Sequence, residues 1–316
     1  MKKIALIYLA VWLSLTAAFA AETTTLTEMS ITTGRESGTY YLIGKDLKKL
    51  LAQNNIDLSV IPSRGSVENL LNLYEFPSIQ LGLAQLDTLT LLALQAAIGG
   101  EDTAPDVQQL LDKIQLVLPL YTEEVHLVAA EAIKQIGDLS GKRIGIGDSA
   151  SGTFGTAQVI LAEFKVEPAE VYAMGEANAI EALRKGEIDA FFYVVGMPAK
   201  VLQDQIKAED KFHLVPLTKK DTEAKLLNTL YKETTIPANT YSWQKEAVPT
   251  LAIGNAVVTA DKGDCTGVGK FAKIVYDNLN WLKQNGHPKW KNIEINLDTL
   301  LKEPKLSPCV AKALKP

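Results

Sequence analysis

Apolar and polar residues alternate along the chain in short blocks that predict strands and helices in turn. Short runs rich in isoleucine, leucine and valine have the length of strands, and they are found at 29–33, 58–62, 79–84, 114–121 and 125–129. Segments with apolar residues at helical spacing separate the first of them, at 40–53, 67–74 and 88–98. Gly99 and Gly100 are expected to end the last of these helices, and residues 101–105 to form a polar loop. Strands separated by helices are typical of parallel βαβ units, so we expect an α/β fold.

Two parts of the chain repeat the same pattern. Residues 31–40 run from a strand through a Gly/Ser loop into a helix, and residues 143–154 do the same. Both loops begin at a glycine that closes a strand, and both end in Ser-Gly-Thr followed by an aromatic residue. A helix–turn–strand pattern is likewise repeated at 70–84 and 180–195. A chain of 316 residues is near the upper limit for one compact domain, so the repeat predicts two lobes built on one plan.

The repeated loops suggest a binding chemistry. The first turn of a helix has unpaired backbone N–H groups and a partial positive charge, and small residues let a ligand approach them closely. An anion is the natural occupant of such a position. The alternative is that the Ser and Thr side chains only cap their helices. One loop alone favours capping, whereas two matching loops, one in each lobe, favour anion binding.

The N-terminus has the features of a secretory signal peptide. Lys2 and Lys3 precede an apolar run at 4–15, and Ala18-Phe19-Ala20 is a typical cleavage pattern, so residues 1–20 are expected to be removed on export to the periplasm. The apolar run is too short for a membrane anchor, which needs about 20 residues. Loss of the two lysines changes the formal net charge from −5 to −7. An acidic chain without clusters of Lys and Arg is a poor partner for nucleic acid.

Cysteine and histidine usage predicts no metal site or cofactor. Cys265 and Cys309 are the two cysteines of the chain, and an oxidising compartment favours a disulfide between them. Neither lies at ligand spacing from a second cysteine or from a histidine. His126, His213 and His287 occur singly, which is more typical of packing or surface residues than of ligands or catalytic bases.

Enzyme motifs are incomplete. Residues 145–150 match the dinucleotide-binding pattern G-x-G-x-x-A, but a single match in mid-chain is a weak signal. Thr153 occupies the place of the P-loop lysine, and residues 147–151 lack the final glycine of a nucleophile elbow. We therefore expect a protein that is not an enzyme. An exported serine hydrolase using Ser149 or Ser151 is the less favoured alternative, because no histidine is an evident base.

A resemblance to a known family spans nearly the whole mature chain. Five stretches carry it, at 31–44, 65–70, 81–87, 139–153 and 189–196. In order and spacing the sequence resembles the TAXI branch of the periplasmic solute-binding proteins of TRAP transporters. The resemblance implies a type II periplasmic-binding-protein fold with a ligand cleft between two lobes. It also implies that a small organic acid such as glutamate or 2-oxoglutarate is bound and delivered to the TRAP membrane permease. A free-standing periplasmic sensor is the main alternative.

The chain departs from this family at two arginines. Arg35-Glu36-Ser37 stands where the family has more glycine, and Ser63-Arg64 stands where it has Thr-Gly. Either arginine can pair with a carboxylate of the ligand or lie in solvent, and position alone does not decide between the two.

The pattern also predicts the lobe boundaries and the ligand contacts. Lobe one is expected to comprise 22–120 and 249–316, and lobe two 121–248, with the hinge at 121–125 and 247–251. Besides the two arginines, the expected ligand-binding residues are Ser37, Thr39, Tyr40, Ser66, Gln85 and Asp87 in lobe one, and Ser149, Ser151, Gly152, Thr153, Tyr193 and Gly196 in lobe two. Asp87 has a binding role if the ligand carries an ammonium group, and is a helix cap if the ligand is a dicarboxylate.

Overall fold

One mixed sheet runs through both lobes of the molecule. The computed structural model describes residues 27–98, 104–219, 225–261 and 266–315. Within these residues the strands are β1 (Thr27–Thr32), β2 (Ile56–Ile61), β3 (Leu81–Gln85), β4 (Ile114–Ala129), β5 (Arg143–Gly145), β6 (Glu170–Tyr172), β7 (Ala190–Val195), β8 (His213–Leu214), β9 (Lys232–Ile236) and β10 (Val248–Ala260). Their order is β2-β1-β3-β10-β4-β7-β5-β6, with β8 paired to β4 and β9 to β10.

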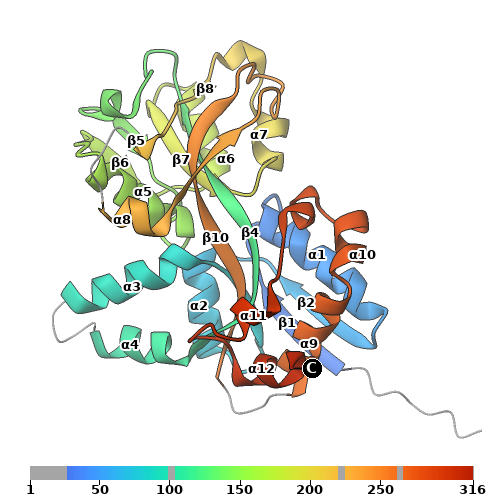
Figure 1. The fold of residues 1–316 in the computed structure, drawn as a ribbon. Coiled ribbons are helices and arrows are strands. Elements are labelled where there is room, and N and C mark those ends of the chain that lie inside the picture. Colours follow the sequence, from blue (N-terminus) through green and yellow to red (C-terminus); the bar gives the residue numbers. More distant parts are fainter. Residues whose placement is uncertain (1–26, 99–103, 220–224, 262–265, 316) are drawn as a thin grey trace, which may run out of the picture.

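Helices surround the sheet in each lobe (Figure 1). One lobe contains α1 (Thr39–Ala52), α2 (Ser66–Glu75), α3 (Leu86–Ile98), α4 (Ala104–Lys113), α9 (Thr266–Asp277), α10 (Leu279–Asn285), α11 (Leu297–Leu300) and α12 (Pro308–Leu314). The other contains α5 (Gly152–Glu163), α6 (Glu176–Arg184), α7 (Lys200–Gln205) and α8 (Lys225–Leu230). Short 3-10 helices lie at Ile136–Leu139, Ala208–Asp210 and Pro288–Asn292. Among the described residues, no helix has the length and apolar character needed to cross a bilayer.

The predicted parallel arrangement is only partly correct. β1 pairs in parallel with β2 and β3, and β5 with β6 and β7. The two long strands β4 and β10 are antiparallel to each other, and they also pair antiparallel with β7 and β3 respectively. The chain therefore passes between the lobes along β4 and returns along β10, side by side through the middle of the molecule (Figure 1).

Two local predictions need correction. The strand segments 114–121 and 125–129 belong to one continuous strand, β4, because the polar residues Thr122, Glu123 and Glu124 between them also lie in the sheet. The predicted loop at 101–105 is too long, because α4 begins at Ala104. The apolar residues Val107, Leu110 and Leu111 of α4 have helical spacing, a signal that the sequence analysis did not use. Residues 99–103 are outside the described part.

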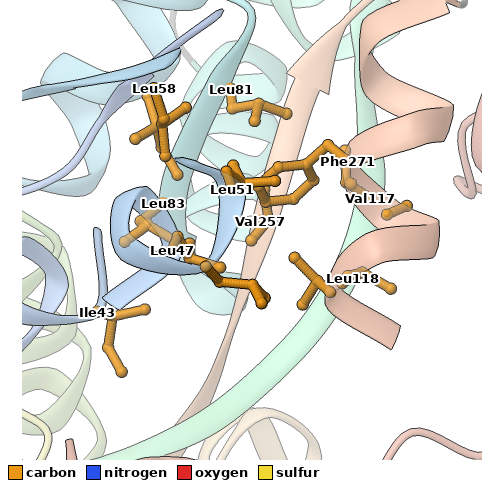
Figure 2. Packing of buried hydrophobic residues seen from close by; sticks show 14 of the residues in the cluster. Ile43, Leu47, Leu51, Leu58, Leu81, Leu83, Val117, Leu118, Val257 and Phe271 are labelled. Atoms are coloured by element: carbon orange, nitrogen blue, oxygen red, sulfur yellow. The ribbon is translucent and has the colours of Figure 1, made fainter. Parts of the chain in front are cut away.

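Each lobe has its own hydrophobic core. In the larger cluster Ile43, Leu47 and Leu51, at i, i+4 and i+8 of α1, pack on the same face of that helix against the sheet (Figure 2). Phe271 of α9 and Val257 of β10 lie close to these side chains. Separate clusters fill the second lobe around residues of β4, α5, α6 and β7. The predicted two-lobed α/β fold is confirmed.

Candidate functional site

A small cavity of about 70 Å³ lies where the lobes face each other. A cavity that holds a single water has a volume of roughly 10–15 Å³, so this space is large enough for a small molecule. Ten of the predicted residues line it: Arg35, Thr39, Tyr40, Arg64, Ser66, Gln85, Ser151, Gly152, Thr153 and Tyr193. Gly147, Asp148, Gly175, Glu176 and Glu123 complete much of the remaining wall. The structure thus brings the two repeated loops together at one place.

Four helices begin at this cavity, two from each lobe. The first residues of α1, α2, α5 and α6 are Thr39, Ser66, Gly152 and Glu176, and all of them line the cavity. The residues before α1, α2 and α6 are glycines that make no side-chain cap. Only at α5, among these four, does a side chain cap the helix: Ser151 Oγ accepts a hydrogen bond from Phe154 N at 3.3 Å. The positive ends of the four helices therefore converge on one small space.

Both arginines at the cavity wall pair with carboxylates of the protein. Arg35 Nη2 lies 2.9 Å from Asp148 Oδ2, and Arg35 Nε lies 3.5 Å from Glu176 Oε2. Arg64 Nε donates to Glu68 Oε2 at 2.8 Å, and its Nη1 lies 3.7 Å from Asp148 Oδ1. Asp148 and Glu176 belong to the second lobe, so both guanidinium groups bridge the lobes while keeping part of their surface exposed.

Several predicted hydroxyl groups already have protein partners. Thr39 Oγ1 donates to the carbonyl of Gly196 at 2.7 Å, which places Gly196 behind the cavity wall rather than on it. Thr153 Oγ1 accepts from Val194 N at 3.0 Å, and Ser66 Oγ accepts from Gln85 N at 3.1 Å. These groups hold the walls in place, and the Thr39 bond also joins the two lobes.

Three more predicted residues do not line the cavity. Ser37 Oγ donates to Glu176 Oε1 at 3.3 Å, at the cavity edge. Ser149 faces a different groove, between α3 and α5. Asp87 is fully buried in the first turn of α3, where its Oδ2 accepts from Thr156 Oγ1 at 2.6 Å and from Tyr231 OH at 2.7 Å. Asp87 therefore joins α3 to the second lobe, and its burial raises the pKa of its carboxyl group.

Three acidic residues of the cavity were missed by the sequence analysis: Glu123, Asp148 and Glu176. Glu123 is only 3% exposed, and its Oε2 accepts from Tyr40 OH at 2.7 Å. Burial raises the pKa of the Glu123 carboxyl to about 8. For Glu123 the available signal was the pair of acids at 123 and 124, which stands between two strand-like apolar runs in the segment predicted to be a hinge.

Gly152 lets the lobes approach closely. A Cβ atom at this position would lie 1.4 Å from Gln85 Oε1, 2.5 Å from Gln85 Cδ and 2.9 Å from Ser66 Oγ. Gln85 is itself buried, and its Nε2 has no hydrogen-bond partner among the described residues. The glycine of the Ser-Gly-Thr loop is thus required by packing across the cavity.

The cavity lining includes none of the three histidines, all of which are described, and it does not include Cys309. His126 is buried between the carbonyl of Glu124 and Tyr241 OH, at 2.9 and 2.8 Å, and burial lowers its pKa to about 4. His213 and His287 also bond backbone groups. The described residues contain no group of three or more His, Cys, Asp or Glu side chains placed to hold a metal ion. Cys309 lies in α12, whereas Cys265 and the signal segment 1–20 are outside the described residues.

Solved structures similar to this chain include proteins named as sulfonate-binding proteins. A protein from Bordetella bronchiseptica RB50 matches with a TM-score of 0.53 and 16% identity, over 91% of this chain and 80% of its own. The alkanesulfonate-binding protein SsuA from Xanthomonas axonopodis pv. citri, bound to MOPS, matches with a TM-score of 0.47 and 17% identity, over 82% and 72%. The periplasmic aliphatic sulphonate binding protein SsuA from Escherichia coli matches with a TM-score of 0.42 and 16% identity, over 82% and 78%. At 16% identity the likeness to the Bordetella bronchiseptica protein is one of fold.

The sequence itself places the chain more specifically. The model of the NMT1-like family matches residues 31–309, which include both lobes and the walls of the cavity. The chain belongs to the NMT1-like family.

Proposed function

We propose that this protein is the extracytoplasmic solute-binding subunit of a TRAP-type secondary transporter of the TAXI branch. It would capture a small organic anion, such as glutamate or 2-oxoglutarate, in the cavity between its lobes and deliver it to the membrane permease. The observation that carries the proposal is the convergence of four helix N-termini and two arginines, from both lobes, on one small space. Backbone N–H groups at helix starts and guanidinium groups are the usual partners of carboxylates.

The arrangement of the chain supports capture by closure of the lobes. We place lobe one at 22–120 and 249–316 and lobe two at 121–248. Core residues of the first lobe lie within 29–121 and 256–314, and those of the second within 125–253. The change from one core to the other therefore falls close to both proposed crossing segments. A rotation about these two strand segments is a hinge motion.

Contacts across the cavity would form and break in that motion. Glu68 N donates to the carbonyl of Ala150 at 3.1 Å, and Arg35 meets Asp148 and Glu176. A ligand between the lobes adds contacts to both of them and so favours the closed state. The permease can then distinguish the loaded protein from the empty one by its shape.

The proposed setting is the periplasm, with residues 1–20 removed and Cys265 joined to Cys309. We propose no catalytic residue and no cofactor for this protein. Its partners are the organic acid and the TRAP permease.

Titration of the mature chain, residues 21–316, tests the proposal. Glutamate or 2-oxoglutarate at a hundredfold excess over its Kd should stabilise the fold by roughly 2.7 kcal/mol and raise the melting temperature, whereas neutral sugars should not. Arg35→Met should weaken binding about ten- to a hundredfold, because a charge-assisted hydrogen bond to the ligand is lost. Arg143→Met is the matched control: Arg143 pairs with Asp189 at 3.1 Å, away from the cavity lining, so Kd should not change. Equal Kd values for the wild type and Arg35→Met would contradict the proposal.

A further inference from the structure

The cavity contains a buried carboxyl group that an anion alone does not explain. Glu123 lies on β4 in the middle of the sheet, lines the cavity, and is almost completely buried. Its Oε2 accepts a hydrogen bond from Tyr40 OH at 2.7 Å, and the neutral amide of Asn255 also lies beside the carboxyl, so both neighbours that contact it are uncharged. A buried carboxylate without a cationic partner is unfavourable, so its presence beside the ligand needs an explanation.

The arginines of the cavity wall are already paired without Glu123. Arg35 and Arg64 contribute two positive charges, and their partners Glu68, Asp148 and Glu176 contribute three negative ones. The other acids near Glu123 are Asp87 and Glu124, and Glu124 is paired with Lys289. The phenol groups of Tyr40, Tyr121 and Tyr193 complete its ionisable surroundings. No described cation is therefore left over for a Glu123 carboxylate.

A second observation points to a ligand with several polar groups. Gln85 Nε2 is buried, belongs to a residue that lines the cavity, and has no hydrogen-bond partner among the described residues. A buried donor without a hydrogen-bond partner is rare in native structures, and an oxygen atom of a ligand would accept from it. The cavity thus offers donors at Gln85 and the helix starts, and an acid at Glu123.

We infer that Glu123 binds the ammonium group of the ligand, so that the cavity selects small α-amino acids over oxo acids of the same carbon skeleton. This inference rests on the proposed function and deepens it. The ligand carboxylate would meet the helix N-termini and Arg35, and its ammonium group would donate hydrogen bonds to Glu123. An oxo acid has no cationic donor to place against this carboxyl, and its keto oxygen can only accept a hydrogen bond from the protonated form.

The assignment couples binding to release of a proton. Burial raises the pKa of Glu123 to about 8, so the carboxyl of the empty protein is protonated at neutral pH. To accept from an ammonium group it must lose its O–H proton to solvent, and about one proton is released per amino acid bound. Apparent affinity for the amino acid should therefore fall about tenfold per pH unit below pH 8. An oxo acid leaves the proton in place, and its affinity should not weaken as the pH falls from 8 to 6.5.

Calorimetric titration at pH 6.5, in two buffers of different ionisation enthalpy, measures both effects. The probes are matched pairs: glutamate with 2-oxoglutarate, aspartate with oxaloacetate, and alanine with pyruvate. In each pair that binds, the amino acid should bind at least tenfold more tightly and release about one proton. Glu123→Gln should weaken amino-acid binding about ten- to a hundredfold and abolish proton release, with the oxo acid little affected.

Glu176→Gln is the matched control, because it removes a carboxylate from the same cavity but should leave proton release intact. Melting curves of both variants establish that they are folded, and the wild-type proton count tests the inference without any variant. Equal binding of both members of a pair, with no proton released, would overturn the inference while the proposed function stands. If no acid of the panel binds, the proposed function fails and the inference with it.

Discussion

Gly152→Val is expected to hold the lobes apart and to weaken ligand binding by more than about a hundredfold, which is the loss of two charge-assisted contacts. The Cβ atom would lie 1.4 Å from Gln85 Oε1 and 2.5 Å from Gln85 Cδ, whereas carbon atoms in contact are separated by about 3.5–4 Å. Gln85 is buried and cannot turn away into solvent. The clash exists only when the lobes are close, so each lobe should fold normally.

Small-angle scattering with and without ligand, together with Kd, checks this result. The wild type should contract when ligand is added, and Gly152→Val should not. Gly137→Val is the control, because a Cβ at Gly137 meets nothing within 4 Å. Contraction of Gly152→Val with a normal Kd would show that the lobes do not need to approach at this point.

Lys289→Met is expected to lower the free energy of unfolding by about 3–5 kcal/mol. Lys289 Nζ lies 2.5 and 2.8 Å from the two carboxylate oxygens of Glu124 and donates to the carbonyl of Thr122 at 2.8 Å. Both side chains of the pair are at most 2% exposed. Removal of the lysine leaves the Glu124 carboxylate buried and without its cation within the proposed crossing segment 121–125, and burial already raises the pKa of Glu124.

Denaturant unfolding at pH 7 measures the effect. The double variant Lys289→Met/Glu124→Gln should recover part of the loss, because it removes the unpaired charge. Lys200→Met, at an exposed pair with Asp204, should change stability by no more than about 0.5 kcal/mol. A loss below about 1 kcal/mol for Lys289→Met would mean that the buried pair is not required.

The sequence predicted the parts of the fold that depend on local periodicity. The first three strands and the helices α1 and α2 lie within two residues of their expected bounds, because their patterns are set by neighbouring residues. Strand direction is different: it depends on which strands pair in space, so the antiparallel β4 and β10 could not be obtained from alternation of elements. The full length of β4 could not be predicted either, because buried acidic residues interrupt its apolar pattern.

The candidate site shows a similar division. The Ser-Gly-Thr loops led to the cavity because a glycine and small hydroxyl residues at a helix start are a local signal. Glu123, Asp148 and Glu176 were missed because acidic side chains are usually exposed, and only tertiary contacts show that these three converge. Asp87 was included because it follows a strand of the repeated pattern, and Ser149 because it lies in a Gly/Ser loop. The Asp87 side chain bonds Thr156 instead, and Ser149 lines the groove between α3 and α5.

We propose that the cavity between the lobes holds the solute by its carboxylate. The most direct test is a crystal structure of residues 21–316 grown with the tightest-binding acid of the calorimetric panel. We expect the ligand carboxylate to lie beside Arg35 and the first N–H groups of α5, between the two lobes. A ligand bound elsewhere, for example in the apolar groove lined by Leu89, Leu111 and Leu300, with the interlobe cavity unoccupied, would contradict it.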